Sequence, residues 1–140
     1  EGAPFIRYRT RDLTRLIPQP CSCGNPLPMH DRILGRSDDM FIFRAVNIYP
    51  GQIDHVLSQV PEIGSEFQVH LERREDGRDY MILKVERRPR SDVDQNEVIA
   101  DRIARDIRKQ ILVSSEVEVL DHGSLPRTER KSKRVFDHRQ

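Results

Sequence analysis

The chain has 140 residues, of which 36% are hydrophobic and 34% charged, with a net charge of +1 and no Trp. This length suits one ordinary domain and excludes two large ones. The near-zero net charge gives no global field for binding nucleic acid or a membrane surface, and no apolar run approaches the roughly 18–20 residues of a spanning helix. Two Cys without a secretory context indicate a reducing, cytoplasmic environment.

The beginning of the chain differs in character from the rest. The sequence starts at Glu1 without an initiator Met, so we expect a piece of a longer protein. Residues 1–36 are rich in Pro, contain both Cys and show a single strand-like run at residues 5–8. That pattern does not predict a packed core. We therefore interpret residues 1–36 as the tail of a preceding domain with a linker, and residues 37–140 as a second domain.

The pattern becomes regular from Met40. The apolar run over residues 40–44 predicts a short buried strand. Pro50 suits the first turn of a helix, and Pro61 would end it. Between the two prolines, apolar residues follow one another at helical spacing. These residues are Ile53, Val56, Leu57 and Val60.

Two strands follow this first helix. Apolar and polar residues alternate over residues 67–71 and again over residues 81–85. A period of two predicts half-buried strands. Asp76-Gly77 between them is typical of a hairpin turn.

A second helix and a last strand complete the pattern. Asp94 and Glu97 resemble a capping box, and Ile then recurs every four residues over residues 99–111, which predicts an amphipathic helix. Residues 117–119 predict a strand, and the residues after Asp121 have the composition of a basic tail. The predicted order is β-α-β-β-α-β. This is the ferredoxin-like arrangement of the α+β class, with two helices on one face of a small antiparallel sheet.

Three segments carry polar and charged residues in a distinctive order. They are residues 8–16 (YRTRDLTRL), residues 35–50 (GRSDDMFIFRAVNIYP) and residues 125–135 (LPRTERKSKRV). Together they resemble the C-terminal end of an adenylate-forming ligase of the phenylacetate–CoA ligase family. The resemblance implies that residues 1–36 are the tail of the large adenylation domain with a linker, and residues 37–140 a mobile C-terminal lid domain.

The same resemblance implies the reaction. The parent enzyme would adenylate an aromatic carboxylic acid such as phenylacetate with ATP and Mg²⁺, and would then form the CoA thioester. The acid, ATP and CoA would bind through the missing N-terminal domain, so the fragment alone would be inactive. Neither nucleic acid nor membrane is an expected partner.

The resemblance also assigns roles to single residues. Asp12 would accept hydrogen bonds from the ribose hydroxyls, and Arg36 would lie near the nucleotide. Asp38 matches the hinge about which the C-terminal domain swings. Lys131 would be the catalytic residue, its ammonium contacting the substrate carboxylate and the α-phosphate. Lys133, two residues further on, is the alternative for that role.

Within the second segment, Arg44-Ala45-Val46-Asn47 would line the channel for the pantetheine arm of CoA. The family usually has Gly where this chain has Ala45, and Gly again where it has Arg130. Gly permits backbone conformations and close approaches that neither residue does. The acceptor therefore stays open between CoA, a carrier protein, and release of the acyl-adenylate.

Two rival interpretations remain. Cys21, Cys23 and His30 would supply at most three ligands of a zinc site that needs four, so we favour a reduced surface loop and expect no metal. A ferredoxin-like fold could also serve as a binding or regulatory module. An RNA-binding version would need exposed aromatic residues on its central strands, and residues 80–86 offer only Tyr80. A Gly/Ser/Thr-rich loop upstream in the parent reading frame would favour the ligase.

Overall fold

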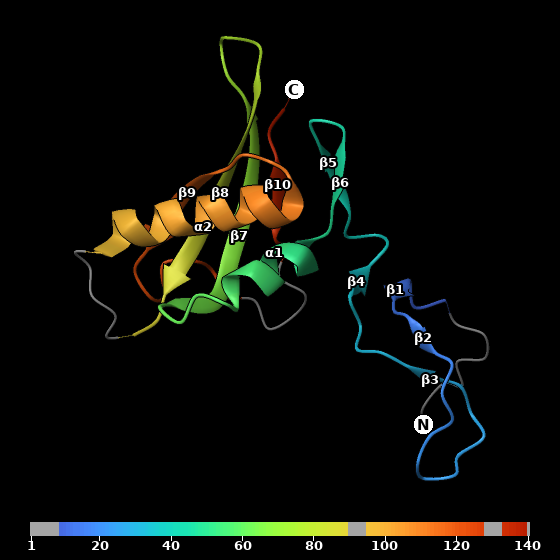
Figure 1. The fold of residues 1–140 in the computed structure, drawn as a ribbon. Helices are drawn as coiled ribbons and strands as arrows, with labels where there is room; N and C mark the ends of the chain where they lie inside the picture. Colours follow the sequence, from blue (N-terminus) through green and yellow to red (C-terminus); the bar gives the residue numbers. More distant parts are fainter. Residues whose placement is uncertain (1–8, 90–94, 128–132, 140) are drawn as a thin grey trace, which may run out of the picture.

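The computed structural model of the chain describes residues 9–89, 95–127 and 133–139. Its main body is a four-stranded mixed sheet in the order β10-β7-β8-β9 (Figure 1). The two central strands are antiparallel to each other, and each outer strand is parallel to its neighbour. The strands are β7 (Ile63–Arg73), β8 (Asp79–Arg87), β9 (Glu116–Leu120) and β10 (Val135–Asp137).

Two helices, α1 (Pro50–Leu57) and α2 (Asn96–Ile111), lie on one face of this sheet (Figure 1). Pro50 occupies the first turn of α1, and the side chain of Gln52 accepts a hydrogen bond from the backbone N–H of Tyr49 at 2.9 Å. The predicted apolar stripes form the core between helices and sheet. On α2 the stripe consists of Ile99, Ile103, Ile107 and Ile111, each at most 5% exposed.

The α+β class and the two helices on one face agree with the prediction, whereas the membership of the sheet differs. The predicted first strand does not join it: β5 (Phe41–Phe43) pairs with β6 (Val46–Ile48) in a separate hairpin. The outer strand comes instead from β10, in the segment predicted to be a basic tail. The prediction of a wholly antiparallel sheet was wrong for both outer pairs. A strand of only three residues is too short to produce a readable period of two.

The part of the chain before the hairpin forms two nested antiparallel pairs, which we call the arm (residues 9–36). In it β1 (Asp12–Leu13) pairs with β4 (Gly35–Arg36), and β2 (Leu16–Ile17) pairs with β3 (Met29–His30). The run at residues 5–8 lies outside the described residues, as does Asp94 of the expected capping box; the N-cap of α2 is Gln95. The division at residue 36 stays a prediction.

The arm approaches the main body at the start of α1 (Figure 1). A Cβ atom at Gly51 would lie 2.6 Å from the backbone oxygen of Leu34, so only Gly fits there. The missing side chain thus permits the arm to lie close to the helix. Among the described residues, no helix has the length and apolarity needed to cross a membrane.

Candidate functional site

The pairing of β1 with β4 brings together the predicted nucleotide-binding residues. Asp12 stands directly opposite Arg36 in the register. The Arg36 guanidinium donates two hydrogen bonds to the Asp38 carboxylate, at 3.0 and 2.9 Å. Residues 12, 36 and 38, predicted separately from two distant motifs, therefore lie at one place in the fold.

The Arg36–Asp38 pair is ionised over a wide pH range. Hydrogen bonding from Arg36 lowers the pKa of Asp38 to about 2, and Arg11 contributes from 4.0 Å. In return, hydrogen bonding to Asp38 raises the pKa of Arg36. The two side chains remain 30% and 29% exposed. The pair thus holds the predicted hinge residue to the end of the arm while leaving it in contact with solvent.

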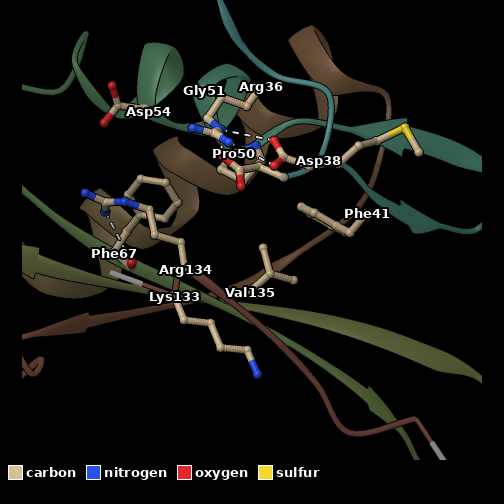
Figure 2. A pocket seen from close by; sticks show the side chains of 12 residues that line it. Arg36, Asp38, Phe41, Pro50, Gly51, Asp54, Phe67, Lys133, Arg134 and Val135 are labelled. Carbon is tan, nitrogen blue, oxygen red and sulfur yellow. Dashed lines mark hydrogen bonds and ion pairs between the residues drawn. The ribbon is translucent and has the colours of Figure 1, made fainter. Parts of the chain in front are cut away.

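A cavity of about 610 Å³ opens beside this pair (Figure 2). Segments from four parts of the chain form its walls: residues 36–41, the first turns of α1, Phe67 of β7, and residues 133–135. The arm, the helix and the C-terminal segment therefore meet around one space. Among the described residues, the positively charged side chains of its lining are Arg36, Lys133 and Arg134.

The two cations of the C-terminal segment are engaged with aromatic rings. The ammonium nitrogen of Lys133 lies 5.3 Å from the centre of the Phe136 ring, and Figure 2 shows its side chain extending away from the Arg36–Asp38 pair. The guanidinium of Arg134 lies over Phe67 at 4.4 Å. It also donates to the backbone oxygen of Ser65 at 3.2 Å. Lys131, the predicted catalytic residue, lies outside the described residues.

The predicted CoA-channel residues sit at the tip of the β5–β6 hairpin and are not among those that line the cavity. Arg44 and Ala45 form its two-residue turn, with φ of 48° and 64°. The Arg44 guanidinium donates to the backbone oxygen of Asp79 at 2.7 Å. Val46 is half-buried and Asn47 exposed. The structure therefore separates this stretch from the residues predicted to bind the nucleotide.

Arg139 ties the same hairpin to the sheet. It donates to the backbone oxygen of Ile42 at 3.1 Å and to the Asp79 carboxylate at 3.2 Å. Asp79 also accepts from Arg73 at 2.9 Å. No sequence pattern predicted this network, because its members are far apart along the chain.

Cys21 and Cys23 lie in a turn of the arm with their sulfur atoms 2.8 Å apart. The hydrogen bond between them lowers the pKa of Cys23. His30 bonds instead to the backbone oxygen of Asp31, at 2.6 Å. Within the described residues, no group of three or more His, Cys, Asp or Glu could hold a metal ion.

One buried carboxylate could not be found from the sequence. Glu86 is 1% exposed, although its position in the alternation of residues 81–86 predicts a polar surface residue. It accepts hydrogen bonds from residues 123–127, a partnership that the periodicity of β8 cannot reveal.

Solved structures of CoA ligases share this fold. A domain of phenylacetate-coenzyme A ligase from Bacteroides vulgatus is 34% identical, with a TM-score of 0.65 over 74% of this chain and 95% of that domain. A 2-hydroxyisobutyryl-CoA ligase in the postadenylation state with R3-HIB-AMP is 32% identical, with a TM-score of 0.78 over 96% of this chain and 29% of its own. The same ligase in the thioesterification state, with 2-HIB-AMP and CoA, gives 0.66 at 31% identity, over 98% and 29%. The fold is therefore that of a domain found in adenylate-forming CoA ligases.

The sequence comparison specifies the family. The profile of the AMP-binding enzyme C-terminal domain matches residues 45–139. The phenylacetate-coenzyme A ligase of Escherichia coli (strain K12) is 37% identical over 99% of this chain and 32% of its own length. The chain belongs to the family of AMP-binding enzyme C-terminal domains, and its predicted resemblance to phenylacetate–CoA ligases is confirmed. It spans about a third of the length of the curated relatives that it matches.

Proposed function

We propose that this chain is the C-terminal part of an ATP-dependent ligase that adenylates an aromatic carboxylic acid such as phenylacetate and then forms its CoA thioester. The observation that carries the proposal is the cavity where the arm meets the C-terminal segment. Arg36 and Asp38 line one side of it, and Lys133, two residues after Lys131, lines the other. Residues proposed for nucleotide binding and hinge motion thus face the described part of the C-terminal segment, which resumes two residues after the proposed catalytic Lys131.

In the adenylation step, Asp12 accepts hydrogen bonds from the ribose hydroxyls, and Arg36 interacts with nucleotide oxygens. Negative charge builds on the α-phosphate as the acid carboxylate attacks phosphorus. The ammonium of Lys131 stabilises that charge, because a positioned cation in a water-poor site lowers such a barrier. Mg²⁺ would accompany the phosphates of ATP. Since the described residues contain no metal-holding cluster, the proposal gives Mg²⁺ no ligand among them.

The second step requires the C-terminal domain to turn so that the Arg44–Asn47 hairpin faces the acyl-adenylate. The similarity scores support such a motion. One ligase gives a TM-score of 0.78 in its postadenylation state and 0.66 in its thioesterification state. The proposal attributes this difference to how the arm and the sheet are arranged in the two states. In the proposal, the arrangement of arm and sheet in this chain is the one that serves adenylation, and Asp38 is the pivot of the motion.

The test is acid-dependent exchange of pyrophosphate into ATP by the full-length parent enzyme, over a panel of aromatic acids. Lys131→Ala should lower the exchange rate by roughly 10²–10³, the cost of removing one preorganised stabilising group. Lys109→Ala, which removes an exposed cation of α2, is the matched control. A rate that falls in Lys133→Ala instead would move the catalytic role to that residue.

The acceptor is tested on the same enzyme by following CoA consumption after adenylation. Thioester formation with free CoA supports the proposal. Exchange without CoA consumption would contradict the CoA step and favour a carrier protein. No exchange with any aromatic acid would contradict the aromatic-acid ligase itself.

A further inference from the structure

The feature that the proposed function does not use is Glu86, a carboxylate buried on the face of the sheet away from the helices. Met81, Leu83 and Val85 of β8 point into the core and are at most 2% exposed. Glu86 points to the opposite face, where its neighbour Lys84 remains 34% exposed. Yet Glu86 is only 1% exposed. A buried charge needs partners that replace water.

The partners of Glu86 come from one short segment. Its carboxylate accepts hydrogen bonds from the backbone N–H of Gly123 at 3.0 Å and of Leu125 at 2.6 Å, and from the Arg127 guanidinium at 3.0 Å. Burial alone would raise the pKa of Glu86, but these donors outweigh it and the pKa is lowered. Leu125 is itself buried, at 6% exposed. The ionised carboxylate thus fastens residues 123–127 to the sheet.

The order of the strands shows which part of the chain the attachment of residues 123–127 to Glu86 constrains. β9 lies at one edge of the sheet and β10 at the opposite edge (Figure 1). Residues 121–134 must therefore pass from one edge to the other. Glu86 holds this segment at its beginning. At its end, the backbone oxygen of Arg134 accepts a hydrogen bond from the N–H of Val69 at 2.7 Å. Lys131 belongs to the short stretch between the two attachments.

We propose that Glu86 is a positioning residue for Lys131. It fixes residues 123–127, which lie directly before the stretch that carries Lys131, and this attachment favours delivery of the catalytic ammonium to the α-phosphate. This inference rests on the proposed function, and it adds a residue that never touches the substrate. Because Lys131 serves the adenylation step, loss of Glu86 affects that step and spares thioester formation.

The experiment uses Glu86→Gln in the full-length parent. Gln has the same shape but no charge, and its amide nitrogen cannot accept from the donors that Glu86 satisfies. Glu118→Gln is the matched control, because Glu118 lies on the neighbouring strand, pairs with Lys84 at 3.4 Å and is 48% exposed. We expect the turnover number for pyrophosphate exchange to fall roughly 10- to 100-fold in Glu86→Gln, the effect of a misplaced catalytic group. The Glu118→Gln enzyme should behave as the wild type.

Two further readouts separate positioning from general damage. Thioester formation from supplied acyl-adenylate and CoA should be unchanged in Glu86→Gln. The double variant Glu86→Gln/Lys131→Ala should be no slower in exchange than Lys131→Ala alone, since residues that act through one another are not additive. Equal loss of both half-reactions, or a full additional loss in the double variant, would overturn the inference.

A second variant covers the case in which Glu86→Gln does not fold. Arg127→Met removes the side-chain donor but keeps both backbone ones, and Arg127 is 55% exposed. Arg127→Met should lower the rate of pyrophosphate exchange less than Glu86→Gln would, and should leave thioester formation unchanged. If Glu86→Gln does not fold, a wild-type exchange rate in Arg127→Met would overturn the inference. A folded Glu86→Gln with wild-type exchange overturns it as well, leaving the proposed function intact. A wild-type parent without acid-dependent exchange overturns the proposed function and this inference together.

Discussion

At the scale of single residues, the Arg36–Asp38 pair governs the charge of the predicted hinge. A free Asp has a pKa of about 3.9. In the folded chain that of Asp38 is about 2. A carboxyl group whose pKa is lowered by folding stabilises the fold above its unfolded pKa, and this contribution disappears as the pH falls through the folded value. We therefore expect Asp38 to titrate near pH 2. The measurement is a pH titration of this chain that follows the carboxyl-carbon NMR signal of Asp38.

Arg36→Gln tests the cause of that shift. Without the guanidinium, the titration midpoint of Asp38 should move up towards the value of a free Asp. Asp137, whose pKa is also about 2 because of Arg139, is the control within the same spectra and should not move. If Asp38 still titrated near 2 in the variant, Arg36 would not be the source of its acidity.

At the scale of elements, the β5–β6 turn places a strained residue where the family usually has Gly. Ala45 has φ of 64° in a two-residue hairpin turn. Such turns favour Gly because a Cβ atom costs about 1–2 kcal/mol in the left-handed region. In the opposite direction, Gly at this position destabilises the fold by about 0.4–1 kcal/mol, because it raises the conformational entropy of the unfolded chain. Ala45→Gly should thus raise the free energy of unfolding by about 0.5–1 kcal/mol, measured by urea denaturation.

The control for the hairpin is the same substitution in a helix. Ala104 lies inside α2, where Gly should cost about 1 kcal/mol because it weakens a helix interior. Opposite signs at the two positions would establish that backbone conformation decides the effect. A loss of stability at both would mean that the turn relaxes around Ala45 without strain.

The elements differ in how far the sequence could predict them. The Ile residues of α2 recur every four residues from Ile99 to Ile111, so their helical period was clear from the sequence. β10 contains three residues inside a basic segment, and its pairing with β7 depends on a contact 66 residues away in sequence, between Val135 and Val69. The convergence of residues 12, 36 and 38 was predictable only through the family resemblance. The burial of Glu86 was not predictable, because the alternation of residues along β8 does not show which other segment of the chain packs on that strand.

At the scale of the whole molecule, the contact between the arm and α1 defines one arrangement of the two parts. Gly51 permits this contact, since a Cβ atom there would lie 2.6 Å from the Leu34 backbone oxygen. Backbone cannot move aside as a flexible side chain can. Gly51→Ala should therefore penalise this arrangement by about 1–3 kcal/mol, the usual cost of overpacking. Such a penalty shifts an equilibrium between arrangements roughly 5- to 150-fold.

The half-reactions of the full-length parent should report that shift. If this arrangement serves adenylation, as proposed from the higher TM-score to the postadenylation state of the related ligase, Gly51→Ala should slow pyrophosphate exchange more than thioester formation from supplied acyl-adenylate. Gly64→Ala is the control, since a Cβ atom there would lie 3.4 Å from the Glu86 backbone oxygen, an ordinary contact. Equal slowing of both half-reactions by Gly51→Ala would mean that the contact supports the fold in every arrangement and does not select between them.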